Sequence, residues 1–193
     1  MKHLSDQELM RIVQAGDHSP ASEIYDRYAG RIYNFALRFL RTPEAAEDAM
    51  QEVFVKMIKH ANQFQGDAKL STWLFSITAN WSRDYLRKAD NKVKETEEVL
   101  ITLPAPADQT PDRRLERREN EIRVQRALQK LTPEQREAIL LSRYQGLSYA
   151  EIAQIAGCSE GAVKTRVFRA METLKKALMG DVRGGDQCLN AMP

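Results

Sequence analysis

The feature that most constrains the fold is the stretch from Ser148 to Arg169, which predicts two short helices joined by a tight turn. Ser148 and Glu151 have the spacing of a capping box, so the first helix is expected to begin at about residue 149. Gly157 is expected to end that helix, because glycine adopts the left-handed backbone conformation without a Cβ clash. Ser159 is a suitable N-cap for the second helix. Two helices joined this closely fit a helix-turn-helix.

The second of these expected helices has an apolar face and a polar, basic one. Val163 and Val167 lie at helical spacing on the apolar face. The remaining surface carries hydroxyl and basic side chains that suit contacts in a DNA major groove, namely Ser159, Lys164, Thr165, Arg166 and Arg169. An ordinary α-helical hairpin with a solvated basic face would show the same pattern. From these residues alone, both interpretations stay open.

Composition and charge exclude several classes of protein. The chain has 193 residues, enough for one or two domains, and a net charge of +2, so it is no polycation. Basic residues outnumber acidic ones from Ile122 onward, which mildly favours a nucleic-acid partner for the C-terminal half. Cys158 and Cys188 are too few for a disulfide framework or a zinc site. With no recognisable signal peptide or membrane span, we expect a cytoplasmic protein.

The sequence lacks the usual signatures of a catalytic site. The three histidines lie far apart in the sequence, at His3, His18 and His60. We find no glycine-rich phosphate loop and no nucleophile motif, and the carboxylates fall on amphipathic helix faces. We therefore expect no enzymatic activity, no metal site and no cofactor.

Helix start signals recur along the chain, which predicts an all-α protein. Capping boxes or serine-proline and threonine-proline pairs begin the expected helices at Ser5, Ser19, Thr42 and Thr132, and Ser71 is expected to cap a further helix. Residues 1–90 show no useful period-two alternation, so strands are not expected there.

A proline-rich segment divides these helices into two domains. Three prolines fall within eight residues, from Pro104 to Pro111, and large apolar side chains are few there. We expect two small helical domains joined by a flexible linker, with the helix-turn-helix in the second domain. The expected ranges are a first domain over 1–90, a linker over 91–120, a second domain over 121–179 and a flexible tail over 180–193.

The helix expected after Ser71 combines aromatic and basic residues. Trp73, Phe75, Trp81 and Tyr85 alternate with polar and basic residues that could contact phosphates. Such rings can stack on exposed bases, but the same rings at helical spacing also fit the ridge of a core. The preceding loop, residues 64–70, is better placed to hold an extruded base, since loops on rigid scaffolds often carry function.

Two groups of motifs resemble bacterial sigma factors. The first group resembles conserved region 2 and comprises Asp48–Lys56, Phe64–Asp67 and Leu70–Asn80. The second group resembles region 4 and comprises Leu131–Ala138, Gly146–Ala153 and Gly161–Ala170. The order of the two groups, with one linker and no third domain between them, resembles the extracytoplasmic-function (ECF) group of the sigma-70 family. The resemblance spans most of residues 5–178.

The resemblance implies three binding surfaces. A helix docking on the clamp of the largest RNA polymerase subunit would use Asp48, Gln51, Glu52 and Phe54. Promoter minus-ten DNA, with a flipped non-template base, would be held by Phe64, Gly66, Asp67, Lys69, Ser71, Thr72, Trp73, Asn80 and Arg83. Minus-thirty-five DNA would be read by Ser159, Lys164, Thr165, Arg166 and Arg169. The second domain would also contact the flap of the second polymerase subunit.

The resemblance further implies a regulated, dissociable specificity subunit. Ser76 and Ile77 stand where primary sigma factors carry paired tryptophans, so weak intrinsic melting and a stringent promoter requirement are expected. Implied partners are core polymerase, promoter DNA and an anti-sigma factor that could hold the protein at the membrane, and the implied role is in a stress or envelope response. Two other functions remain open from the residues: a stand-alone helix-turn-helix regulator, and a polymerase-binding adaptor whose basic helix is only surface.

Overall fold

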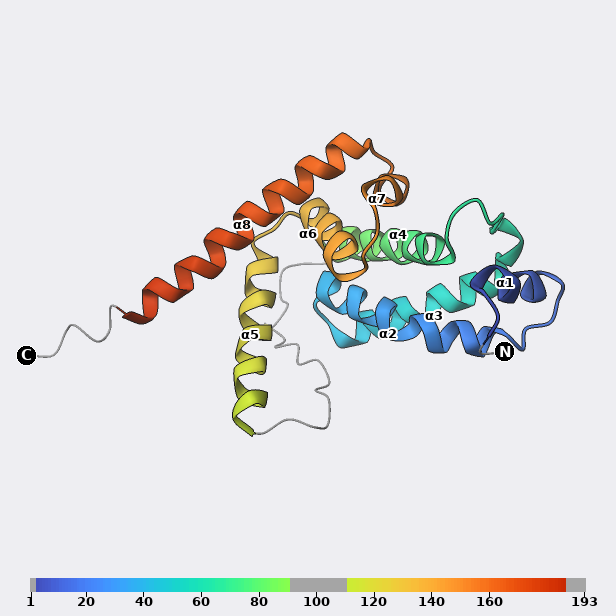
Figure 1. Ribbon diagram of the computed structural model, residues 1–193, viewed down its shortest axis with the longest axis horizontal. Coiled ribbons are helices and arrows are strands. Elements are labelled where there is room, and N and C mark those ends of the chain that lie inside the picture. Colours follow the sequence, from blue (N-terminus) through green and yellow to red (C-terminus); the bar gives the residue numbers. More distant parts are fainter. Residues whose placement is uncertain (1–2, 91–110, 187–193) are drawn as a thin grey trace, which may run out of the picture.

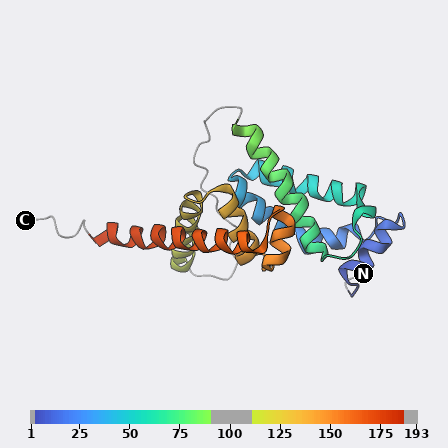
Figure 2. The ribbon, with the colours of Figure 1, turned by 90° about the horizontal axis from the view of Figure 1, so that it is seen from above.

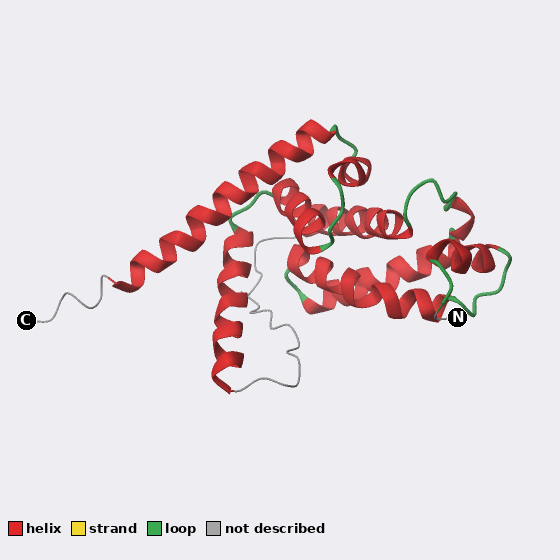
Figure 3. Ribbon diagram, viewed as in Figure 1, coloured by secondary structure: helices red, strands yellow, loops and turns green. Residues whose placement is uncertain are grey.

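The computed structural model describes residues 3–90 and 111–186, and all of its regular elements there are helices (Figures 1 and 3). The first half contains α1 (Asp6–Gln14), α2 (Ala21–Leu40), α3 (Pro43–Lys59), the short 3-10 turn η1 (Ala61–Gln63) and α4 (Leu70–Asp90). The second half contains α5 (Pro111–Gln129), α6 (Pro133–Ile139), the π-helical turn η2 (Leu140–Tyr144), α7 (Tyr149–Ala156) and α8 (Glu160–Asp186). The predicted all-α class is confirmed.

Local capping signals set most of the helix starts. Capping boxes close the N-termini of α1, α6 and α7 through Ser5, Thr132 and Ser148, each with its partner three residues later. The hydroxyl oxygen of Ser159 accepts the amide hydrogen of Ala162 at 3.2 Å and so caps α8. These contacts confirm the predicted starts, because each one depends only on residues within one helical turn.

Three expected boundaries differ from the structure. Helix α5 begins at Pro111, so residues 111–120 of the expected linker are helical, and residues 91–110 of that linker lie outside the described residues. Helix α4 begins at Leu70, and the amide of Trp73 donates to the carbonyl of Lys69 at 3.2 Å, so Ser71 lies inside the first turn and is not its cap. Helix α8 continues to Asp186, past the expected end near residue 179. A single glycine at position 180 costs a helix only about 1 kcal/mol and does not end it. Residues 187–193 of the expected tail lie outside the described residues.

The core of the first half forms around α2, which packs against α3 and α4. Phe35 and Phe39 stack along α2 with ring centroids 5.8 Å apart, and the ring of Phe75 from α4 meets Phe35 edge-on at 5.7 Å. All three rings are fully buried. Burial of large rings of this kind supplies much of the stabilising free energy of a small helical unit.

The two halves pack directly on each other and share one apolar core. Helix α2 contacts α6 and η2. Helix α4 contacts α7, and these two helices lie side by side in Figure 2. Polar contacts follow the same seam: the Arg31 guanidinium donates to the Gln145 carbonyl at 3.1 Å, and Arg136 donates to the Phe39 carbonyl at 3.2 Å. Helix α8 packs on α5 and α6 and then extends beyond the other helices (Figure 1).

None of the described helices combines the length and the apolarity that a membrane crossing requires.

Candidate nucleic-acid interface

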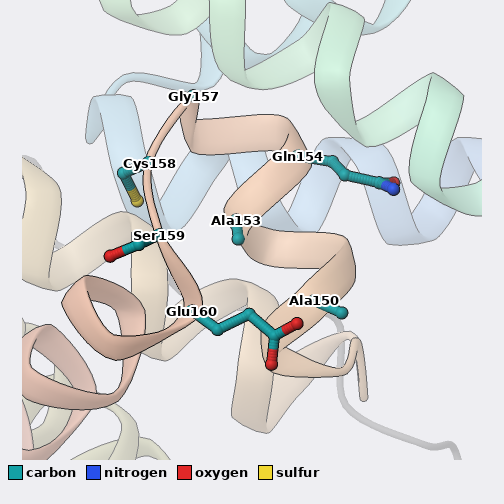
Figure 4. A pocket seen from close by; sticks show the side chains of 7 residues that line it. All are labelled: Ala150, Ala153, Gln154, Gly157, Cys158, Ser159 and Glu160. Carbon is teal, nitrogen blue, oxygen red and sulfur yellow. The ribbon is translucent and has the colours of Figure 1, made fainter.

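The helix-turn-helix is formed by α7 and α8, which meet at the turn from Gly157 to Ser159 (Figure 4). Gly157 has a φ of 61°, the left-handed conformation that reverses the chain after α7. Ile152 on α7 and Val163 on α8 are fully buried in the same apolar core. A pocket opens along the outer side of the turn and is lined by Ala150, Ala153, Gln154, Gly157, Cys158, Ser159 and Glu160.

Helix α8 presents a basic face to solvent. Lys164, Thr165 and Arg169 are exposed, whereas Arg166 is partly covered and its guanidinium lies 3.5 Å from the Cys158 sulfur. The Thr165 hydroxyl donates to the Gly161 carbonyl at 2.9 Å within the helix, and the hydroxyl of Ser159 serves as the helix cap. Lys164 and Arg169 are therefore the side chains of this set most available to reach base edges or phosphates.

The loop before α4 is supported by α1. Gln14 donates its amide hydrogens to the carbonyls of Ala61 and Phe64 at 2.9 and 2.7 Å, and Gln7 reaches the Gly66 carbonyl at 3.4 Å. These contacts enclose a small pocket between loop and helix, lined by Gln7, Arg11, Gln14, Phe64, Gln65, Gly66 and Asp67. Sequence analysis missed this supporting role of α1, because the glutamines are separated from the loop by about fifty residues and carry no motif.

The predicted minus-ten residues differ in their exposure. Asp67, Lys69 and Asn80 are exposed, as a contact surface for DNA requires. Phe64 is 6% exposed, and its ring packs against Trp73 with centroids 5.5 Å apart. Ser71, 9% exposed, and Thr72, 3% exposed, are buried in this arrangement.

Thr72 and Lys69 both contact the start of α7, although the Lys69 side chain remains 76% exposed. The Thr72 hydroxyl donates to Oε1 of Glu151 at 3.1 Å, and the Lys69 ammonium lies 3.2 Å from the same oxygen. The other oxygen of Glu151 accepts from the backbone amide and the hydroxyl of Ser148. Burial works against ionisation of this carboxyl, but the hydrogen bonds from Ser148, Lys69 and Thr72 outweigh it and lower the pKa of Glu151 to about 2.

Arg83 joins α4 to both α7 and α6. Its guanidinium donates to the Ile155 carbonyl at 3.1 Å and to the Asn80 side chain, and its Nε lies 3.7 Å from a carboxylate oxygen of Glu137. Glu137 is buried, which raises its pKa above the ordinary value, although Arg83 and Arg166 pull the pKa down. Both Asn80 and Arg83 thus lie at the seam between the halves.

The aromatic residues of α4 divide between core and surface. Phe75 is fully buried, which settles its role as a core residue. Trp81 and Tyr85 stack with ring centroids 5.3 Å apart and an interplanar angle of 18°, and both retain solvent exposure. Trp73 is also partly exposed.

Helix α3 carries the predicted polymerase-docking residues on two faces. Asp48 and Gln51 are exposed, and Glu52 is partly exposed and lies 3.5 Å from the Lys56 ammonium. Phe54 is 8% exposed and packs on the Tyr25 ring at 4.8 Å between centroids. Phe54 therefore supports α3 from inside the core, and the surface that a partner could touch consists of the three polar side chains.

Helices α7 and α8 form a helix-turn-helix whose inner face is buried and whose second helix presents an exposed basic face. This arrangement defines a DNA-binding protein of the helix-turn-helix class. Comparison with known proteins narrows this class. Residues 24–92 match the family model for sigma-70 region 2, and residues 121–174 match the model for sigma-70 region 4. The chain belongs to the sigma-70 family of RNA polymerase sigma factors, and its relatives identify it as a transcription initiation factor of the ECF type.

Several individual proteins are similar over nearly the full chain. The RNA polymerase sigma-H factor of Pseudomonas aeruginosa is 34% identical over 180 residues, which cover 90% of this chain and 93% of that protein. The ECF RNA polymerase sigma factor SigM of Mycobacterium tuberculosis is 36% identical over 174 residues, covering 90% and 85%. The solved structure of CnrH in complex with the cytosolic domain of CnrY has a TM-score of 0.70 at 25% identity, covering 91% of this chain and 98% of that one.

Proposed function

We propose that this chain is a dissociable promoter-specificity subunit that binds core RNA polymerase and directs it to promoters with minus-ten and minus-thirty-five elements. One observation carries this proposal. The helix-turn-helix exposes the basic face of α8, and it packs on a helical unit that matches sigma-70 region 2. The protein would supply recognition while polymerase supplies the chemistry, so we assign it no catalytic activity of its own.

The second half would read the minus-thirty-five element. With α8 in the major groove, Lys164 and Arg169 could pair with base edges, and each good bidentate contact contributes about 1–3 kcal/mol of discrimination. Contacts to phosphates would position the helix without specifying sequence. The low net charge of +2 indicates that the free protein neutralises few phosphates, so we expect it to bind DNA weakly.

The first half would bind polymerase and the minus-ten element. Asp48, Gln51 and Glu52 offer an acidic and amide surface on α3 for the clamp of the largest polymerase subunit. The loop of residues 64–70, held by α1, would accept a flipped base, and the preformed loop would offset part of the few kcal/mol that base extrusion costs.

We further infer a cytoplasmic protein controlled by an anti-sigma factor. A solved structure of RpoE from Bartonella quintana in complex with the anti-sigma factor NepR has a TM-score of 0.69 at 27% identity, covering 82% of this chain and 96% of that one. A membrane-bound anti-sigma partner would couple this chain to an external signal, which fits a role in a stress or envelope response.

In vitro transcription tests the proposed function directly. Purified core polymerase with this protein and a promoter library should yield specific initiation, and core polymerase alone should not. Arg169→Ala should reduce discrimination among minus-thirty-five sequences, with Lys175→Ala, an exposed basic change further along α8, as the matched control. Nanomolar binding to duplex DNA without polymerase, together with no specific initiation, would instead identify a stand-alone regulator.

A second measurement addresses polymerase docking. Asp48→Ala combined with Gln51→Ala should weaken co-purification with core polymerase, because both side chains lie on the exposed face of α3. Asp26→Ala removes an exposed acid from α2 and serves as the control. Equal retention of all three proteins on core polymerase would refute the docking surface.

A further inference from the structure

Helix α1 is firmly anchored to the first half of the chain. Its residues Leu9 and Met10 are fully buried in the apolar core. At its first turn the Asp6 carboxylate lies 3.0 Å from the Arg27 guanidinium of α2. A loop that bonds to a helix held in this way takes its position from a rigid element. The loop of residues 64–70 is such a loop.

A single glutamine at the end of α1 holds this loop in place. Gln14 is the last residue of α1 and is half-buried. Its amide nitrogen donates to the Ala61 carbonyl at 2.9 Å and to the Phe64 carbonyl at 2.7 Å. A glutamine amide nitrogen carries two hydrogens, so these two bonds use its full donor capacity. Because both partners are carbonyl oxygens, a side chain that can only accept hydrogen bonds cannot replace it.

The pocket between α1 and the loop has the size and the polar groups of a site for one base. Its volume is about 160 Å³, close to the roughly 150 Å³ of a cavity that holds one benzene ring. Arg11 and Asp67 line it from its two sides, and both are exposed. Neither side chain makes a hydrogen bond or an ion pair within the described part of the chain. Donors and acceptors around a flat ring are the groups that read the pairing edge of an extruded base.

We propose that α1 forms one wall of the minus-ten site, where Arg11 donates to a carbonyl of the extruded base and Gln14 is the positioning residue that holds the loop around it. The proposal rests on the proposed function, which assigns the loop of residues 64–70 to the minus-ten element. Because Gln14 fixes the loop, the pocket exists before DNA arrives. A loop without this support is competent only part of the time, and the apparent affinity for DNA falls by that fraction.

Competition binding of forked promoter DNA to core polymerase reconstituted with this protein tests the base contact. Each non-template minus-ten position carries each of the four bases in turn, while the duplex part stays constant. The wild-type complex should prefer one base at the captured position. Arg11→Ala should reduce that preference about tenfold, as loss of one charged hydrogen bond implies, and should leave the other positions unchanged. Lys59→Ala, which removes an exposed basic side chain from the end of α3, is the matched control.

Substitutions of Gln14 test the support of the loop. Gln14→Met removes both donors at similar volume, and we expect about tenfold weaker binding of the fork together with a weaker preference at the same position that Arg11→Ala affects. Gln14→Glu keeps the shape but turns acceptors towards the two carbonyls, so its loss should be at least as large. Gln63→Glu makes the same change on the exposed surface of η1 and should keep the preference. All of these variants should co-migrate with core polymerase as wild type does.

These outcomes separate the role of α1 from the proposed function. Absence of specific initiation by the wild-type complex would refute the proposed function itself. With initiation intact, the role of α1 is refuted if Arg11→Ala keeps the wild-type base preference, or if both Gln14 variants match Gln63→Glu. An equal loss for all four bases in Arg11→Ala, with a smaller salt dependence, would identify a phosphate contact and overturn the base contact. Arg11 is exposed, so its variant decides the question even where a Gln14 variant fails to fold.

Discussion

Replacement of Arg136 by methionine should destabilise the whole chain, because this buried guanidinium ties the ends of two helices together. It is 9% exposed and donates to the carbonyls of Leu128 at 3.0 Å, Phe39 at 3.2 Å and Leu131 at 3.3 Å. Burial, with a smaller contribution from Arg41, lowers its pKa from the ordinary 12.5, and the arginine remains charged at neutral pH.

The expected magnitude follows from the hydrogen bonds that the change removes. Methionine keeps most of the side-chain volume but leaves the carbonyls without their donor. A hydrogen bond involving a charged group contributes about 1.5 kcal/mol or more, so loss of the two shortest bonds costs about 3 kcal/mol. In a chain of this size, 1 kcal/mol shifts Tm by about 2–4 °C, which predicts a fall of about 6–12 °C.

Thermal and urea unfolding, followed by circular dichroism, would measure this loss. Arg143→Met, which alters an exposed arginine in the following η2 turn, is the matched control and should change stability little. Because Arg136 bonds to both halves, the transition should stay single in wild type. A loss below about 1 kcal/mol, within the range of surface substitutions and ordinary hydrogen bonds, would show that the carbonyls find other donors and would refute the reasoning.

Three further predictions concern backbone and charge. Gly157→Ala should destabilise the protein by about 1–2 kcal/mol, because a φ of 61° is strained for a residue with a Cβ even though no atom lies within 4 Å of the added Cβ. Gly30→Ala adds a Cβ in similarly open space in the helical interior of α2, and it should raise Tm in the same melting assay. The pKa of Glu151 is lowered from 4.5 to about 2, so the stabilising contribution of its carboxylate is complete above about pH 4.5 and is lost as the pH falls towards 2. A series of urea unfolding midpoints measured at decreasing pH should show this loss in wild type and a smaller loss in Glu151→Gln. Glu137→Gln should raise Tm at pH 7 by about 2–4 °C, because burial raises the pKa of this carboxyl and its Oε1 has no hydrogen-bond partner within the described structure, so a neutral amide is better tolerated; an unchanged or lower Tm would contradict this.

Short-range signals in the sequence predicted much of the fold. The capping boxes at Ser5, Thr132 and Ser148 and the left-handed Gly157 are present as expected, since each depends on a few neighbouring residues. Ser71 was assigned to the wrong side of a helix boundary, because a serine inside the first turn of a helix and one at its cap look alike in sequence.

Contacts between distant residues could not be predicted in this way. The Thr72–Glu151 hydrogen bond joins residues 79 positions apart, and neither residue belongs to a periodic pattern that specifies its partner. The support of the 64–70 loop by Gln14 was missed for the same reason. The resemblance to sigma factors placed Phe54 among the polymerase-docking residues, whereas the structure buries its ring on the core face of α3.

The contact between Arg136 and the Phe39 carbonyl has a consequence during synthesis. The two residues are 97 positions apart, so α2 leaves the ribosome well before the arginine that covers its end. At translation rates of about 5–20 residues per second, that interval lasts about 5–20 s. For this time the N-terminal half exists without its intramolecular partner, with the surfaces of α2 and α4 open. The incomplete chain therefore exposes the surfaces of α2 and α4 that the second half later covers, and a binding partner present at the ribosome would have access to them.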